Sequence, residues 1–313
     1  FRPGTLMALA VLASTILYLI LEQGFGLSAE PVTYMMVDLI RGSMYLFLIS
    51  ILTFYAGVLV WREREAKLDD VFDALPYRTV SVFAAKLAAL LVVAAALQLI
   101  VIVAGIASQA LQGYHRHQVG LFLTELLGTD LLRFFLLMVL AFACHVVAPN
   151  RYVGYFLFVV ALILNAFLGY LLDVESNLFR YGALPDYVYS DLFGLAPFAE
   201  GLVWFGLYGL AGSLLVALLS LLMWQRGRET NWRWRLAEAR RRWRGSLRTA
   251  SFAAVVVWFG LFGWIAWNTM GLNELTSPET RIRRQAAFEK EFRSTESNPI
   301  PTIVAVTYDI DLY

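Results

Sequence analysis

The stretch FYAGVLVWREREAKLDDVFDALPYRTVSVFAAK, residues 54–86, shapes the interpretation of the rest of the chain. A long apolar run stops at Trp61, and a short segment dense in charge follows it. An Ala-Leu-Pro break at 74–76 then precedes a second apolar run. This pattern predicts two membrane spans joined by a charged helical connector over residues 62–76. A rigid connector of this kind can transmit a push from outside the membrane to both spans.

The composition points to a membrane protein. Hydrophobic residues make up 59% of the 313 positions and charged residues only 16%, whereas soluble domains are about half apolar and a quarter charged. The apolar residues fall in blocks long enough to cross roughly 30 Å of hydrocarbon at about 1.5 Å per helical residue. The single cysteine excludes a disulfide framework within the chain. We therefore predict an all-α polytopic membrane protein with seven transmembrane helices.

The apolar blocks give the expected positions of the spans. Between them we expect a loop at 22–40, an amphipathic interfacial stretch at 109–128 and a long polar and aromatic loop at 173–199. The seven predicted spans are residues 5–21, 41–61, 79–108, 130–148, 152–172, 201–224 and 250–271.

The basic residues in the short loops predict the orientation. The loop 225–248 holds nine Arg against two Glu, so we expect it to be cytoplasmic. Counting spans from there places the connector on the same side, and the loops at 22–40, 109–128 and 173–199 outside. The N-terminus is then cytoplasmic, and the tail after Leu272 is extracytoplasmic.

Tryptophans interleave with the arginines of the basic loop 225–248. Nucleic-acid binding is one interpretation of such a pattern. An amphipathic helix on anionic lipid is the better one, because the loop lies between two spans. Six arginines are the expected lipid contacts: Arg233, Arg235, Arg240, Arg241, Arg242 and Arg244.

Sequence motifs for chemistry are missing from these residues. There is no GxxxxGK[ST] phosphate loop, no HExxH, and no Cys/His set with zinc spacing. We therefore expect no catalytic site, no metal and no cofactor in this chain.

Polar residues inside the predicted spans are few. Lys86 and Arg133 lie near span ends, where they can snorkel to the surface. We interpret the mid-span amide Asn165 as a helix-packing residue rather than a substrate contact. No buried charge pair is expected at mid-membrane, which disfavours an ion-coupled transporter. Gly206, Gly209 and Gly212 in the sixth span, and Gly260 and Gly263 in the seventh, predict close-packed helix faces.

The tail from Leu272 has a soluble composition. Residues 278–297 are typical of a polar helix, and residues 303–313 alternate as a β-strand does. One strand cannot stand alone, and the chain begins without Met. We therefore expect a piece of a longer polypeptide, in which residues 303–313 open an extracytoplasmic β-domain.

The connector AGVLVWREREAKLDDVFDALPYRTVSVFAAK resembles the first cytoplasmic loop of type-2 ABC exporter permeases. In that family a span ends in an acidic-basic helix, a Leu-Pro break follows, and a Lys lies at the start of the next span. That helix docks into a groove of a separate ATPase subunit. The resemblance implies that an ATPase contacts Arg62, Glu63, Arg64, Glu65, Lys67, Asp70, Asp73 and Pro76.

Four further segments are similar to one bacterial subfamily, whose members fuse such a permease to an extracytoplasmic zinc aminopeptidase of the aminopeptidase-N class. They are EPVTYMM (30–36), QGYHRHQVGLFLTELLG (112–128), YSDLFG (189–194) and NPIPTIVAVTYDIDLY (298–313). This similarity implies that residues 1–271 are the second half of the permease domain. Residues 272–313 would then be a linker and the start of a peptidase-like β-domain.

The resemblance implies an ABC exporter subunit in the bacterial inner membrane. ATP and Mg²⁺ would bind to a partner ATPase on the cytoplasmic face, and zinc only to the missing peptidase region. Further partners would be the other permease half or a second protomer, and membrane lipids, but not nucleic acid. The alternative is a multi-span anchor or scaffold for the aminopeptidase, without transport activity.

Overall fold

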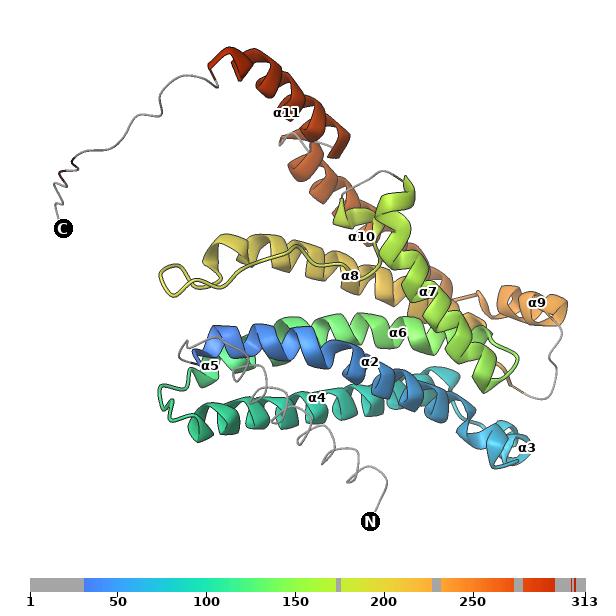
Figure 1. The fold of residues 1–313 in the computed structure, drawn as a ribbon. Helices are drawn as coiled ribbons and strands as arrows, with labels where there is room; N and C mark the ends of the chain where they lie inside the picture. The colour runs from blue at the N-terminus through green and yellow to red at the C-terminus, as the bar shows by residue number, and fades with distance from the viewer. Residues whose placement is uncertain are drawn as a thin grey trace.

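The computed structural model describes residues 31–172, 176–226, 232–272 and 278–295, together with Ala305 and Thr307. Within these residues the fold is helical (Figure 1), and six helical segments are long and apolar enough to cross a membrane. These helices indicate a multi-pass membrane protein. They are α2 (Thr33–Glu65), α4 (Thr79–Leu111), the continuous run of α5 (Val119–Phe122), η1 (Leu123–Asp130) and α6 (Leu131–Val147), then α7 (Arg151–Leu172), α8 (Ala196–Leu222), and α10 (Ser246–Ala266) continued by η3 (Trp267–Gly271).

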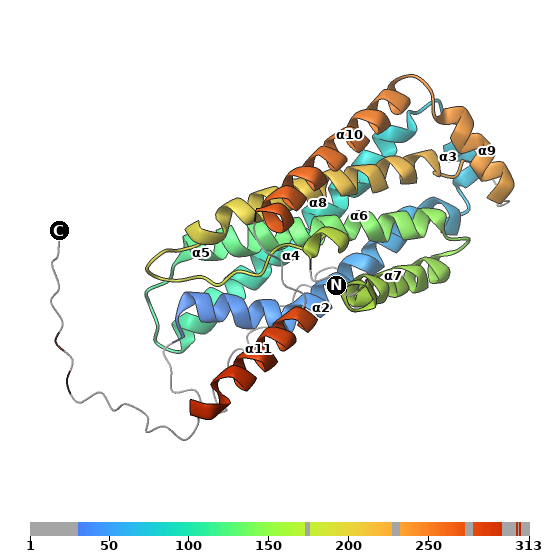
Figure 2. The same cartoon turned by 90° about the horizontal axis from the view of Figure 1, so that it is seen from above.

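Two shorter helices, α3 (Asp69–Ala74) and α9 (Trp232–Arg242), lie at the same end of the bundle (Figures 1 and 2). We call this the connector end. The opposite end carries residues 112–118 and 183–195, and we call it the far end. The structure therefore brings the charged connector and the arginine-rich segment together, as the orientation prediction requires.

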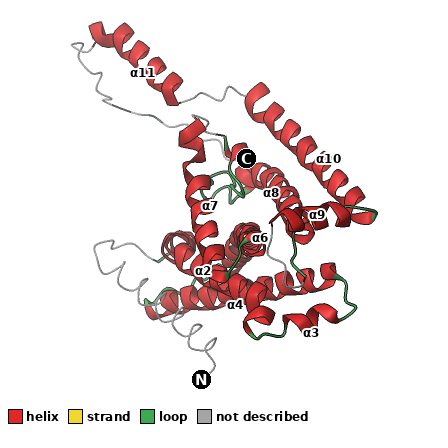
Figure 3. Ribbon diagram, turned by 90° about the vertical axis from the view of Figure 1, so that its right-hand side faces the viewer, coloured by secondary structure: helices red, strands yellow, loops and turns green. Residues whose placement is uncertain are grey.

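Helix α6 lies in the middle of the bundle and contacts α2, α4, α7 and α8, while α10 packs on α8 (Figure 3). Large apolar side chains fill the space between α2, α4 and α6, among them Met36, Leu90, Phe122 and Met138. Helices in hydrocarbon associate through close van der Waals contact rather than through the hydrophobic effect. The fit of these side chains therefore decides the packing.

Six of the seven predicted spans correspond to these helices, and the span predicted at 5–21 lies outside the described residues. Two of the predicted loops are wrong in part. The loop expected at 22–40 is helical from Thr33, because Met36 and Ile40 pack into the core. The interfacial stretch expected at 109–128 instead ends α4 and begins the helix that continues into α6, where Phe122 and Leu126 are fully buried.

The glycines of α8 mark packing faces, as predicted, whereas the same prediction is wrong for Gly260 and Gly263 of α10, where an added Cβ would meet no atom of the described residues within 4 Å. A Cβ atom added at Gly209 would lie 2.8 Å from Leu136 Cδ1 of α6. One added at Gly212 would lie 3.2 Å from Trp258 Nε1 of α10. The small residues therefore allow α8 to approach two neighbouring helices closely.

The segment between α7 and α8 turns back into the bundle. Its Leu178 is buried. The Tyr181 hydroxyl lies 2.9 Å from the Leu136 carbonyl oxygen and 2.8 Å from the Ser213 hydroxyl. Ser213 is about 25 Å along α8 from its first residue, at 1.5 Å per residue. The sequence predicts an external loop here, whereas residues 176–184 line the interior of the far half of the bundle.

Side chains satisfy the backbone of this re-entrant segment. The Asn165 amide accepts a hydrogen bond from the Tyr181 N–H at 2.7 Å and donates one to the Tyr181 carbonyl at 3.0 Å. The Tyr208 hydroxyl donates to the Leu178 carbonyl at 2.9 Å. Irregular backbone at membrane depth is stable only when protein groups satisfy it. Asn165 thus holds this segment in place, rather than joining two helices as predicted.

The tail is described in part. Helix α11 (Pro278–Phe292) and the 3₁₀ turn η4 (Arg293–Thr295) confirm the polar helix expected there. The strand expected at 303–313 lies outside the described residues, except for Ala305 and Thr307, which are not in a strand.

Candidate functional site

The connector is broken into two pieces, so the single helix predicted over 62–76 is wrong. Helix α2 ends in a Schellman motif, in which the Leu68 N–H bonds the Glu63 carbonyl at 2.9 Å and the Lys67 N–H bonds the Arg64 carbonyl at 3.0 Å. Lys67 has φ of 54°, the left-handed conformation that this motif requires. Glycine is the usual residue at this position, and its absence hid the break in the sequence.

Helix α3 presents an apolar surface to solvent. Leu68, Val71 and Leu75 are 56%, 66% and 51% exposed. The helix ends where Leu75 becomes extended (φ −72°, ψ 143°), because the residue before Pro76 disfavours the helical region. The connector therefore offers a short helix whose outer face is apolar and whose first turn is acidic.

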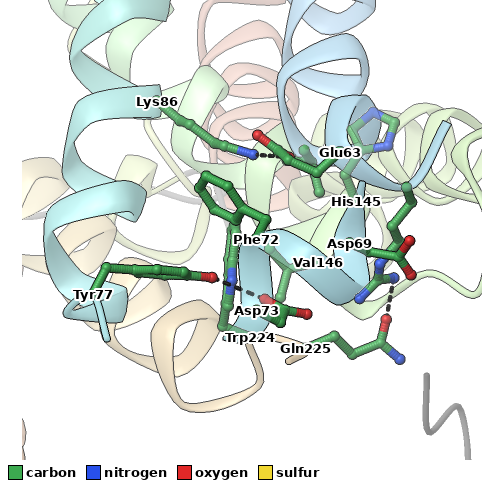
Figure 4. A pocket seen from close by; sticks show the side chains of 12 residues that line it. Glu63, Asp69, Phe72, Asp73, Tyr77, Lys86, His145, Val146, Trp224 and Gln225 are labelled. Atoms are coloured by element: carbon green, nitrogen blue, oxygen red, sulfur yellow. Dashed lines mark hydrogen bonds and ion pairs between the residues drawn. The ribbon is translucent and has the colours of Figure 1, made fainter. Parts of the chain in front are cut away.

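Several connector charges face the bundle instead of a partner. Lys86 Nζ lies 2.5 Å from the Glu63 carboxylate and donates to the Leu59 carbonyl at 2.7 Å (Figure 4). The Arg64 guanidinium donates to the Gln225 side chain. The predicted snorkelling of Lys86 is therefore replaced by an internal ion pair between α2 and α4.

Two more connector residues have partners within the chain. Asp73 accepts a hydrogen bond from the Tyr77 hydroxyl at 2.9 Å, and burial together with this bond raises the pKa of Tyr77 to about 12. Glu65 pairs with Arg151 of α7 at 2.9 Å. Of the eight predicted contact residues, Glu63, Arg64 and Glu65 thus bond residues outside the connector, and Asp73 bonds Tyr77 directly after it. The other four are exposed: Arg62, Lys67, Asp70 and Pro76.

Residues that follow α8 hold the connector in position. Arg226 Nη2 donates to the Asp73 and Leu75 carbonyl oxygens, both at 3.1 Å, and its guanidinium lies 4.4 Å from the Tyr77 ring centroid. These are the free carbonyls at the C-terminal end of α3, which a basic side chain satisfies well. Movement of α3 is therefore linked to α8 as well as to α2 and α4.

Arg235 does not face lipid, contrary to the prediction for the basic loop. It is only 4% exposed and donates to the carbonyl oxygens of Val147 at 3.0 Å and Met223 at 3.1 Å. These carbonyls end α6 and α8, so Arg235 caps two helices at once. Arg242 also turns inward and donates to the Trp224 carbonyl. The remaining predicted lipid contacts are exposed: Arg233, Arg240, Arg241 and Arg244.

A cleft of about 40 Å³ lies between the connector and the bundle. It is lined by Glu63, Arg64, Trp224 and His145 among others (Figure 4). His145 is 1% exposed, its ring packs 4.7 Å from the Tyr155 ring, and neither of its nitrogens has a hydrogen-bond partner among the described residues. Ligand pockets usually measure about 300–1,000 Å³. The cleft is therefore a contact region between the connector and the bundle, and it is too small for a nucleotide.

A buried charge network at the far end was missed in the sequence. Arg41 Nε lies 3.0 and 3.1 Å from the two Asp130 oxygens, and its Nη2 lies 2.7 Å from the Glu125 carboxylate. The Tyr187 hydroxyl accepts from Arg41 at 2.8 Å and donates to Glu125 at 2.5 Å. Burial and the bond to Glu125 raise the pKa of Tyr187, which keeps its phenol protonated and able to donate.

The network depends on the π-helix η1, in which Glu125 and Asp130 lie five residues apart. Bonding between residues i and i+5 brings both carboxylates to one face, whereas α-helical spacing would separate them. π-helical turns occur frequently at functional sites. The available signal was Arg41, Glu125 and Asp130, which lie in or next to segments predicted to share one side of the membrane.

Among the described residues there is no cluster of metal-ligating side chains. Comparison with protein-family models, with curated proteins and with solved structures yields no match to this chain. The functional argument therefore depends on the connector end and the far end themselves.

Proposed function

We propose that this chain is the transmembrane subunit of an ABC-type exporter and that a separate ATPase subunit binds to α3. The observation that carries the proposal is the exposed apolar face of Leu68, Val71 and Leu75. This face lies at the connector end of the bundle, the end that also carries the arginine-rich α9 (Figures 1 and 2). Helix-in-groove docking onto a partner would remove it from water.

The energetics of docking favour this surface over the charged residues. Full burial of a Val or Leu side chain stabilises a complex by about 1.5–3 kcal/mol relative to exposure. Exposed ion pairs contribute about 0–1 kcal/mol. The apolar face would therefore supply most of the affinity, with Asp70 and Lys67 setting orientation.

The contacts that hold α3 against the bundle support a role in coupling ATP hydrolysis to movement of the spans. A push on α3 reaches α2 through the tight turn at Lys67, α4 through Pro76, and α8 through Arg226. Closure of an ATPase dimer on binding ATP and Mg²⁺ would thus move three spans together. Access between this bundle and a second permease half or protomer would change as a result.

The remaining parts of the proposal follow from the family resemblance and from loop charge. The connector end is cytoplasmic in the bacterial inner membrane, since nine Arg lie in residues 225–248. The residues after α10 lead to an extracytoplasmic aminopeptidase, and zinc belongs to that region.

Photocrosslinking tests the proposal. A benzoylphenylalanine at position 71 should crosslink in intact membranes to a subunit that carries a phosphate loop, and the purified complex should hydrolyse Mg-ATP. Val188 is 72% exposed at the far end, so the same probe there is the matched control. With the probe kept at position 71, Leu68→Asp on the same exposed face should abolish the crosslinked complex. A product at position 71 without an ATPase contradicts the proposal. A complex that contains a peptidase and no ATPase would favour the membrane anchor.

A further inference from the structure

A cavity of about 370 Å³ lies between α2, α6, α7 and the re-entrant segment 176–184. Its walls combine apolar side chains such as Ile49, Leu137 and Leu162 with two arginines, Arg133 and Arg180. It shares no lining residue with the connector or with the Arg41 network, although Arg133 lies near enough to Asp130 of that network to attract it. A volume of this size accommodates a small ligand or the polar part of a larger one.

Arg180 has no charged partner among the described residues, and the only charged partner of Arg133 is Asp130, which attracts it electrostatically. Arg133 and Arg180 form no side-chain hydrogen bond and no ion pair with a described residue, and the buried Nε of Arg180 lacks an acceptor. Asp130 attracts Arg133 electrostatically, but both oxygens of Asp130 are hydrogen-bonded to Arg41. Asp186 also lines the cavity and is exposed.

Arginines with so few charged partners are unusual inside a helical bundle. Arg133 lies within the helical run that begins at Val119 and not at its first turn, and its side chain is half-buried. Arg180 enters the bundle with the segment that Tyr181 anchors. Ionisable side chains inside a membrane bundle normally have a partner and indicate a functional site.

The buried and half-buried charges of the far end have a small excess of arginine, although the exposed Asp38 also pairs with Arg41 at 3.5 Å. Among its described residues that are buried or half-buried, the arginines outnumber the carboxylates by one. An uncompensated buried charge is costly, so a bound anion would stabilise the fold. The buried and half-buried charged residues are Arg41, Arg133 and Arg180 on one side, and Glu125 and Asp130 on the other.

The cavity opens toward the side of the bundle. Leu46 and Ala166 form part of its lining and are exposed, Leu46 to 72%. Helix α7 contacts α2 near the connector end, where Tyr155 donates to the Phe54 carbonyl, and tilts away from it toward the far end (Figure 1). The opening therefore lies on the lateral surface of the bundle, between two helices that are long and apolar enough to cross a membrane.

We propose that this cavity binds an anionic amphiphile, with its phosphate or carboxylate between Arg133 and Arg180 and its alkyl chain in the opening between α2 and α7. Guanidinium groups bind such oxyanions through paired, charge-assisted hydrogen bonds. The site requires neither an ATPase nor transport, so it stands independently of the proposed function.

Native mass spectrometry of the purified full chain tests the site with three probes. Dioctanoyl phosphatidic acid carries both anion and chains, dioctanoyl phosphatidylcholine carries chains without net charge, and inorganic phosphate carries no chain. Phosphatidic acid should bind at least tenfold more tightly than either of the others. Arg180→Gln should weaken its binding by about tenfold to a hundredfold, the effect of losing a charge-assisted hydrogen bond.

Two further variants keep the test decisive. Arg116→Gln removes an exposed arginine from the same end and should leave binding unchanged. Ala166→Trp fills the exposed mouth without changing charge and should weaken binding of phosphatidic acid even if Arg180→Gln fails to fold. Equal binding of phosphatidylcholine, tight binding of phosphate alone, or equal losses in Arg116→Gln each overturn the proposal.

Discussion

Replacement of Arg41 by Met is the sharpest test of the far-end network. The Glu125 and Asp130 side chains are only 3% and 7% exposed, and Arg41 bonds both. Removing the guanidinium leaves two buried carboxylates without their counter-ion, which costs about 3–5 kcal/mol in such pairs. Arg41→Lys should lose less, because a single ammonium keeps the charge but cannot bond both carboxylates as the planar fork does.

Thermal stability in detergent, followed by the fraction that remains monodisperse on size-exclusion chromatography, measures this loss. Arg151→Met is the matched control, because the Glu65 partner of Arg151 is 47% exposed and such pairs contribute about 0–1 kcal/mol. The triple variant Arg41→Met, Glu125→Gln, Asp130→Asn should recover most of the loss, since no charge is then buried alone. A loss no larger than that of Arg151→Met, or no recovery in the triple variant, would refute the reasoning.

Two other predictions concern the backbone. Lys67→Gly should stabilise the chain by about 1 kcal/mol, because glycine adopts the left-handed conformation without strain. Ala66→Gly is the control and should not stabilise the chain, because Ala66 has a helical φ of −78°. The thermal unfolding midpoints of the two variants test this prediction. Asn165→Leu should remove both hydrogen bonds to the Tyr181 backbone. The buried N–H and C=O of Tyr181 would then lack partners, at a cost of about 1–3 kcal/mol each. Amide hydrogen exchange in residues 176–184 should therefore become faster. Unchanged exchange would show that Asn165 is not the anchor.

Much of the connector could be predicted from the sequence, because its signals are local. The end of the apolar run near Trp61 and the Pro76 break place the helix ends within a few residues. The break at Lys67 could not be predicted, since its left-handed conformation follows from the hydrogen bonds of the Schellman motif and not from a glycine. Nor could the inward turn of Glu63, which depends on where α4 places Lys86.

The far end was harder to predict, because its order comes from contacts between distant segments. Arg41 and Asp130 are 89 residues apart, and no window of sequence contains both. The positions of Glu125 and Asp130 suggest opposite faces until the π-helix brings them together. The re-entrant segment looks like an ordinary polar loop, since the groups that satisfy its backbone belong to Asn165 and Tyr208.

The two ends are connected by a single rigid element. Helix α2 has 33 residues, or about 50 Å at 1.5 Å per residue, with Glu63 near one end and Arg41 near the other. If an ATPase pushes on α3 as proposed, α2 tilts, and its far end must either carry η1 with it or break the bonds of Arg41 to Asp130. Charge-assisted bonds in a buried site resist breaking. The network would therefore make α2 and the central α5–η1–α6 helix move as one body, so that the connector acts on the middle of the bundle and not on its edge.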